Sequence, residues 1–193
     1  MRSLRPFALG LVLLAAARPA AAQSPFTFGF GGSLTVPVGD TREYGFGDLS
    51  PSLSPGWQGM GLFQIRPFRT TLGFQLDGSY QRVGLGASSF GTRQVFNGTA
   101  NLVYEFGRTR TTAVVPYVIG GAGVYSFRSR GFDSSSTRFG LNAGAGLNLR
   151  FGPGMFFLES RFHNVFRAGL GPDGGDASAQ LIPITAGFKL NGP

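Results

Sequence analysis

The stretch "MFFLESRFHNVF" at residues 155–166 brings together side chains that can do acid–base chemistry. Alternate side chains of a strand point to the same side, so a strand here puts Glu159, Arg161 and His163 on one face. His163 is the only histidine of the chain. A carboxylate, a guanidinium and an imidazole in a row can form an active site, a solvated surface or the lining of an interior. Which of these applies depends on which face of the strand is outside.

The N-terminus has the features of a secretory signal peptide. Arg2 and Arg5 precede the apolar run "FALGLVLLAAA", which at 7–17 is too short to span a bilayer as a helix. Small residues in "ARPAAAQ" then predict cleavage between Ala22 and Gln23. We therefore expect two parts, a cleaved signal peptide at 1–22 and an exported domain at 23–193.

Composition excludes several classes of protein. The 193 residues contain no cysteine, which rules out disulfides and thiolate metal sites. The net charge of +8 does not indicate nucleic-acid binding, because the chain is exported and shows no helical basic face. Only 13% of residues are charged while 42% are hydrophobic, and after residue 22 no apolar run is long enough for a transmembrane helix.

Hydrophobic residues recur with period two throughout the exported part, which predicts strands and no helices. Each strand has an apolar face without charges and an opposite face that holds glycine, amides and the charged residues. The expected strands are 25–37, 57–66, 71–82, 94–106, 113–127, 137–151, 155–166 and 179–190.

Two architectures fit such two-faced strands, a soluble lipocalin-like barrel with an apolar core and an outer-membrane barrel with an apolar outside. The many Phe, Tyr and Trp of the apolar face would overfill the narrow interior of an eight-stranded barrel. The connections also alternate between long and short, as in outer-membrane barrels. We therefore predict an all-β fold, an eight-stranded antiparallel up-and-down transmembrane β-barrel with a polar interior.

This prediction assigns the rings of the apolar face to two girdles, one at each membrane interface. The apolar face of 113–127 is taken as Val115, Tyr117, Ile119, Tyr125 and Phe127. The outer girdle is expected to contain Trp57, Tyr80, Tyr125, Phe127 and Phe166. The periplasmic girdle is expected to contain Phe26, Phe106, Phe151, Phe156 and Phe188.

Four segments carry a family resemblance: "PYVIGGAGVYSF" (116–127), "FGLNAGAGLNLRF" (139–151), "FFLESRFHNVF" (156–166) and "LIPITAGFKL" (181–190). Together with the opening "FGFGGSLTVPVGD" (28–40), they resemble the small eight-stranded outer-membrane β-barrels of the OmpA/OmpX-like family. The resemblance covers most of 24–190. It implies the same barrel architecture and localisation in the outer membrane.

The resemblance also implies that Glu159 and Arg161 belong to a buried charge network. Inward candidates on other strands are Asp77, Arg138 and Arg150. A second cluster nearer the periplasm would contain Arg66, Glu105 and Lys189. A structural network is the preferred interpretation of these charges, because a closed polar interior must satisfy its own polar groups. A narrow ion or proton path is the alternative.

Some barrels of this kind are lipid A deacylases or acyltransferases, so an enzyme must be weighed. A deacylase would use a serine nucleophile, a histidine base and an acidic residue. Here Val165 and Phe166 follow the histidine where a serine would be needed, and His163 has inward parity. We predict no catalytic site, no metal site and no cofactor.

The expected role is therefore non-catalytic: membrane integrity, adhesion or surface interaction. The partners would be outer-membrane lipids and a surface ligand bound through loops 38–56 and 128–136. We expect a monomer. A narrow transport path, a lipid A-modifying enzyme and a soluble lipocalin-like binding protein are the alternatives.

Overall fold

The computed structural model describes residues 25–38, 56–67, 70–84, 92–107, 112–129, 135–152, 154–167 and 178–191. They form β1 (Phe26–Val38), β2 (Gly56–Ile65), β3 (Leu72–Gly84), β4 (Thr92–Glu105), β5 (Val114–Ser129), β6 (Ser135–Phe151), β7 (Gly154–Val165) and β8 (Ala179–Asn191). All eight predicted strands are confirmed, with ends that shift by at most two residues. No helix among the described residues is long and apolar enough to cross a membrane. The expected signal peptide at 1–22 lies outside the described residues.

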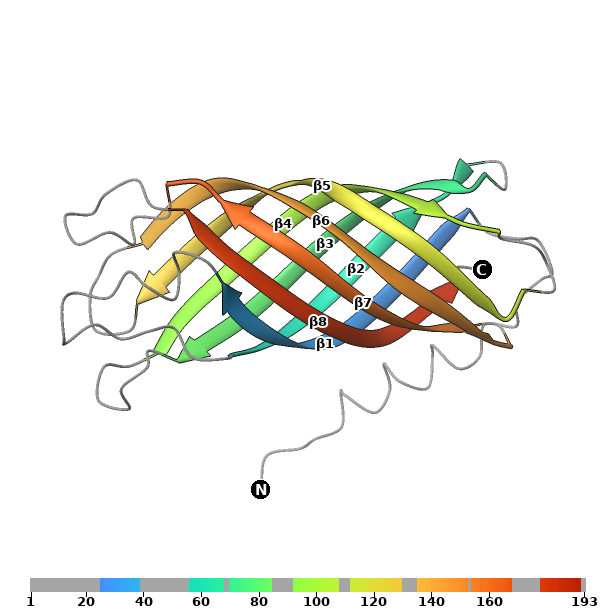
Figure 1. Ribbon diagram of the computed structural model, residues 1–193, viewed down its shortest axis with the longest axis horizontal. Coiled ribbons are helices and arrows are strands. Elements are labelled where there is room, and N and C mark those ends of the chain that lie inside the picture. Colours follow the sequence, from blue (N-terminus) through green and yellow to red (C-terminus); the bar gives the residue numbers. More distant parts are fainter. Residues whose placement is uncertain are drawn as a thin grey trace, which may run out of the picture.

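The strands close into a barrel whose order follows the sequence. Each strand pairs antiparallel with its neighbours, and β1 also pairs with β8, so that Phe30 lies opposite Gly61 on one side and Phe188 on the other. Figure 1 shows that the strands are tilted relative to the barrel axis. Closure leaves no strand edge unpaired, as a sheet in lipid requires.

The barrel has a polar interior and an apolar exterior. Phe30 and Leu34 are 63% and 69% exposed, while Gln64 and Lys189 are 1% and 0% exposed. In water this arrangement would expose a large apolar surface and bury charges at high cost. Lipid removes the first cost, and ion pairs inside the barrel offset the second. The predicted membrane barrel is therefore confirmed, and the soluble lipocalin-like alternative is excluded.

The two ends of the barrel differ in their connections. The start of β1 and the end of β8 lie at the right-hand end in Figure 1, together with the ends of β2, β4 and β6. The strands that meet at this end are separated in the chain by 66–71, 106–113 and 152–153, whereas 39–55 and 166–178 separate strands that meet at the other end. Outer-membrane barrels place short turns in the periplasm, which assigns this end to the periplasmic side. We call the opposite end of the barrel the outer end.

The strand ends that flank the two loops expected to bind a ligand lie at the outer end. The first, 38–56, lies outside the described residues apart from its two end residues. The second was predicted too long: β5 continues to Ser129 and β6 begins at Ser135, so only 130–134 connect them. The residues at these two strand ends do not alternate between apolar and polar, so the sequence pattern does not reveal that the strands continue.

The predicted outward face of β5 is wrong. Val115, Tyr117, Ile119, Tyr125 and Phe127 point into the barrel and are at most 4% exposed. The other face of β5 carries valines as well, so the hydrophobic pattern does not show which face of this strand points into the barrel. In the structure the hydroxyls of Tyr117 and Tyr125 hydrogen-bond to polar side chains inside the barrel. The strand register determines where the interior has space for their rings.

Glycines make room for these interior rings. Tyr117 lies opposite Gly146. A Cβ atom at Gly146 would lie 2.5 Å from the Tyr117 ring, and one at Gly140 would lie 2.8 Å from the Tyr125 ring. Large rings therefore do fit inside this narrow barrel where the paired neighbouring strand has glycine. Tyr125 and Phe127 are thus removed from the outer girdle, while the other predicted girdle residues do lie on the outer face.

Candidate functional site

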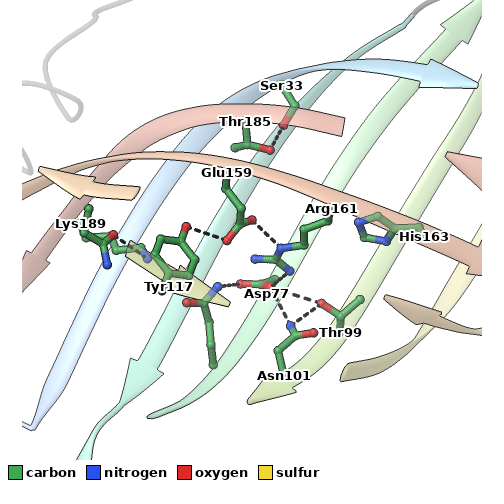
Figure 2. Close-up of polar contacts among 12 residues, drawn as sticks. Ser33, Asp77, Thr99, Asn101, Tyr117, Glu159, Arg161, His163, Thr185 and Lys189 are labelled. Carbon is green, nitrogen blue, oxygen red and sulfur yellow. Dashed lines mark hydrogen bonds and ion pairs between the residues drawn. The ribbon is translucent and has the colours of Figure 1, made fainter. Parts of the chain in front are cut away.

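The centre of the interior is an ion-pair cluster that spans the barrel. Glu159 and Arg161 project from β7, and Asp77 reaches them from β3, which is not adjacent to β7. Arg161 Nη1 lies 2.5 Å from Asp77 Oδ2, and Arg161 Nε lies 2.5 Å from Glu159 Oε1. All three residues are at most 7% exposed. One guanidinium thus bridges two carboxylates from opposite walls (Figure 2).

Neutral side chains complete the hydrogen bonding of Asp77. Gln75 Nε2 donates to Asp77 Oδ1 at 2.8 Å, and Asn101 Nδ2 donates to Asp77 Oδ2 at 2.8 Å. Thr99 Oγ1 donates to the same Oδ2 at 3.3 Å. These residues come from β3 and β4, where alternation places them on the inner face with Asp77. A buried carboxylate needs such donors because the interior offers it little water.

On the other wall, Tyr117 supports Glu159. Its hydroxyl donates to Glu159 Oε2 at 2.8 Å, leaving Oε1 for Arg161. A hydrogen bond to a charged group stabilises a fold more than a neutral one does. Because Tyr117 belongs to β5, this contact also ties β5 to the cluster (Figure 2).

Replacing Tyr117 with phenylalanine should therefore destabilise the barrel. We expect the free energy of unfolding to fall by about 1.5–3 kcal/mol, since Glu159 would lose a buried donor. The measurement is the urea midpoint of the refolded protein in lipid vesicles. Tyr104→Phe is the matched control, because Tyr104 is 44% exposed on the outer face. Equal midpoints for the two variants would show that the Tyr117 hydroxyl contributes nothing.

A second cluster lies nearer the periplasmic end. Arg66 Nη2 lies 2.6 Å from Glu105 Oε1, and Asn148 Nδ2 donates to the same oxygen at 3.0 Å. Lys189 Nζ donates to Asn148 Oδ1 at 3.3 Å. Lys189 also lies over the Tyr117 ring, at 4.6 Å from its centroid, and so connects this cluster to the central one.

Lys189 is completely buried and rests on aromatic faces. Its Nζ lies 4.8 Å from the centroid of the Phe157 ring, in addition to its contact with Tyr117. Cation–π contacts gain strength when they are desolvated, which helps to hold an ammonium in this position. The buried charges among the described residues balance, with Asp77, Glu105 and Glu159 against Arg66, Arg161 and Lys189.

Six of the eight residues expected in the interior network are thus brought together in the two clusters. Arg150 is only half-buried and lies close enough to Arg66 for their charges to repel. Arg138 is different: it is exposed at the outer end of β6, although its parity is inward. The prediction that Arg138 belongs to the buried network is therefore wrong, because alternation gives the face of a residue but not its depth.

Five contributors to the two clusters were not part of the predicted network. Tyr117 was assigned to the wrong face, and Gln75, Thr99, Asn101 and Asn148 carry no charge to mark them. Gln75 does stand two residues before Asp77, on the same face of the strand, and this spacing was the available signal.

His163 lies in the interior on the outer side of the central cluster. It is 6% exposed, and its Nδ1 lies 2.7 Å from the Tyr125 hydroxyl. No carboxylate forms an ion pair with it in the described part of the chain. A histidine that faces the interior and is held by a tyrosine cannot reach a lipid ester at the outer face, so this geometry is unsuited to a deacylase.

Beside His163 and Arg161 is a small polar cavity. It also borders Ser79, Asn97 and Thr185. The space within it that the centre of a water molecule can occupy is about 10 Å³. Ser79 Oγ and Arg161 Nη2 are buried there without a protein partner. A single buried water needs about this much space, together with polar groups that can hydrogen-bond to it. The cavity is therefore suited to a bound water and too small for an organic ligand.

Metal binding finds no support in the part of the chain that the structure describes. No three His, Asp or Glu side chains there are grouped closely enough to hold an ion. The two carboxylates of the central cluster are both engaged by Arg161. What this arrangement can do chemically is to tie β3, β4, β5 and β7 together across a polar interior.

Comparisons with known proteins agree with this architecture. The chain is similar to the crystal structure of Neisserial surface protein A, with 15% identity, a TM-score of 0.64 and coverage of 88% of this chain and 98% of that one. It is also similar to the outer membrane protein OprG from Pseudomonas aeruginosa, with 14% identity, a TM-score of 0.57 and coverage of 89% and 99%. At these identities the likeness shows the fold alone. No curated protein sequence matches the chain.

The sequence itself carries a family signature over nearly its whole length. The model of the outer membrane protein beta-barrel domain matches residues 7–189. A closed eight-stranded barrel with an apolar exterior is the fold expected of such a domain. The chain therefore belongs to the outer membrane protein beta-barrel domain family.

Proposed function

We propose that this protein is a non-catalytic outer-membrane barrel that acts through its surface, in membrane integrity, adhesion or the binding of a ligand by loop 38–56 and by the connection at 130–134. The observation that supports this proposal is the filled interior. Each of the two charge clusters crosses the barrel and pairs its carboxylates with a cation of the same cluster. An interior of this kind stabilises the wall, and interaction is then left to the outer end and to the lipid-facing surface. A closed barrel has no free edge, so we expect it to act as a monomer.

A loop exchange tests the surface role. Cells that lack the protein would receive either the full chain or a chain in which residues 40–54 are replaced by a short Gly–Ser linker. We expect both barrels to fold and to migrate differently before and after boiling. Only the full chain should restore detergent resistance or adhesion to surface ligands. Full restoration by the linker variant would contradict a role for this loop.

Conductance separates the proposal from a transport path. The purified barrel in planar bilayers is expected to show no discrete channel openings, because Arg161 and its two carboxylates close the centre of the interior. A porin in the same bilayers provides the positive control. Reproducible openings that disappear on removal of the protein would support a pore instead.

Lipid analysis separates the proposal from an enzyme. The mass spectrum of lipid A from cells that express the protein should be the same as that from cells that express His163→Ala, since His163 faces the interior. A species that changes in acyl content with the wild-type chain, but not with the variant, would establish lipid A modification.

A further inference from the structure

Two arginines stand on the lipid-facing side of the outer end, in one row of the sheet. Trp57 lies opposite Arg82, Arg82 opposite Gln94, and Gln94 opposite Arg128. Arg82 and Arg128 have the outward parity of their strands. Neighbouring strands are about 4.8 Å apart, so the two arginine Cα atoms lie about 10 Å apart, and their long side chains can reach one common group. We call Trp57, Arg82, Gln94 and Arg128 the rim row.

The positive charge of the rim row is not neutralised within the part of the barrel that the structure describes. The acidic residues described there, Asp77, Glu105 and Glu159, are all buried in the interior. Arg82 Nε is buried without a hydrogen-bond partner. Arg128 is exposed, and its guanidinium lies 5.7 Å from the centroid of the Phe96 ring. Two such guanidinium groups match the oxygens of a phosphate, which accepts paired hydrogen bonds from each.

Aromatic rings lie directly below the rim row on the same outer face. Tyr80 is opposite Phe96 in the register, and their ring centroids are 4.9 Å apart. Trp57 packs edge-on against Tyr80 at 5.7 Å. Tyrosine and tryptophan concentrate at the membrane interface, where one end of the side chain meets water and the other meets lipid. Trp57 and Tyr80 therefore place the neighbouring part of the rim row near the lipid headgroups.

The next row toward the membrane centre has no side chains on three adjacent strands. Gly61 lies opposite Gly78, and Gly78 lies opposite Gly98. A Cβ atom at Gly78 would meet nothing within 4 Å. The row ends in Phe30 and Val124, which are 63% and 55% exposed. We call the three glycines the glycine floor; it is flanked by large side chains and lies below a basic rim.

We propose that this face of β2–β5 binds a phosphorylated glycolipid of the outer leaflet, of the lipid A type. Arg82 and Arg128 hold a headgroup phosphate, and an acyl chain lies on the glycine floor between Phe30 and Val124. The positive charges of Arg82 and Arg128 require a negatively charged headgroup. The glycine floor favours a lipid over a soluble polyanion, because it lies within the apolar band that only lipid contacts. This site is independent of the proposed surface role of the loops.

The test uses the full-length barrel in phosphatidylcholine nanodiscs that contain a minor fraction of lipid A. Native mass spectrometry counts the lipid A molecules that stay bound to wild type, to Arg82→Gln/Arg128→Gln and to Arg138→Gln. Arg138 is the matched control: it is an exposed arginine at the same end, but on the inward-facing parity of β6. All three chains must show heat-modifiable gel mobility, which the exterior position of the substitutions should preserve.

We expect the double variant to lose lipid A retention by about tenfold or more, since each charge-assisted contact contributes on the order of one decade in affinity. Arg138→Gln should retain lipid A as wild type does. A second variant, Gly78→Phe, fills the glycine floor without touching the arginines and should also reduce retention. Wild-type retention by the double variant would overturn the proposal.

Replacing lipid A with phosphatidylglycerol distinguishes the two sources of phosphate. We expect weaker retention of phosphatidylglycerol by wild type and little change on Gly78→Phe. Equal retention of both lipids, lost equally in the double variant, would overturn the assignment to a glycolipid and leave a general anionic-lipid surface.

Discussion

Arg161→Met is expected to lower the free energy of unfolding by about 3–5 kcal/mol, because it leaves two buried carboxylates without their cation. Arg161 contacts Asp77 and Glu159 at 2.5 Å each. Methionine keeps much of the volume of the side chain, so the loss of packing is small and the effect is electrostatic. The urea midpoint of the barrel in lipid vesicles, at neutral pH, measures the change.

Two further variants distinguish this effect from a general loss of charge. Arg138→Met removes an exposed arginine and should change the free energy of unfolding by less than about 0.5 kcal/mol. The triple variant Asp77→Asn/Glu159→Gln/Arg161→Met should recover part of the lost stability, because no buried charge is then left unpaired. An unchanged midpoint for Arg161→Met would show that water reaches the two carboxylates and solvates them in place of Arg161.

Gly187→Val is expected to lower the free energy of unfolding by about 3 kcal/mol or more, the upper part of the range for overpacked positions. Gly187 lies between Gly31 on β1 and Phe157 on β7. A Cβ atom there would overlap the carbonyl oxygen of Phe30 and would lie 2.6 Å from both the Gly31 Cα and the Phe157 ring. Backbone cannot move aside as a flexible side chain can, so the β1–β8 closure itself would be disturbed.

Gly59→Val is the matched control for this substitution. Gly59 is on the outer face of β2, where an added Cβ would meet nothing within 4 Å. We expect its free energy of unfolding to stay within about 0.5 kcal/mol of wild type. The fraction of protein with folded gel mobility and the urea midpoint would be measured for both variants. Comparable losses in both would mean that valine acts through strand propensity or insertion, not through the crowded interior at Gly187.

Much of the barrel could be predicted from the sequence, because it depends on local alternation. The strands were placed to within two residues, and the polar face was identified correctly on the strands that carry charges, such as β3 and β7. Asp77, Glu159 and Arg161 could be assigned to the interior for that reason. An error of phase would have brought charges to the lipid face of those strands, and one register slip reverses every side chain.

On β5 this local signal failed. Its two faces are both apolar, so Tyr117 and Tyr125 could be assigned to either side. Their inward position depends on partners from other strands: Glu159 and His163 as hydrogen-bond partners, and Gly146 and Gly140 as the space for the rings. No residue near β5 in the sequence carries that information.

By itself, then, the sequence determined the strands, their number and, where charges alternate with apolar residues, the face that each strand turns to lipid. These follow from the period of two, which is a local property of the chain. Only the tertiary structure decided which charges meet. Asp77 reaches Arg161 across the barrel, 84 positions away in the chain. Arg82 and Arg128 come to share one row through the register of β3, β4 and β5. Register and closure depend on pairing between distant segments, and local alternation does not specify that pairing.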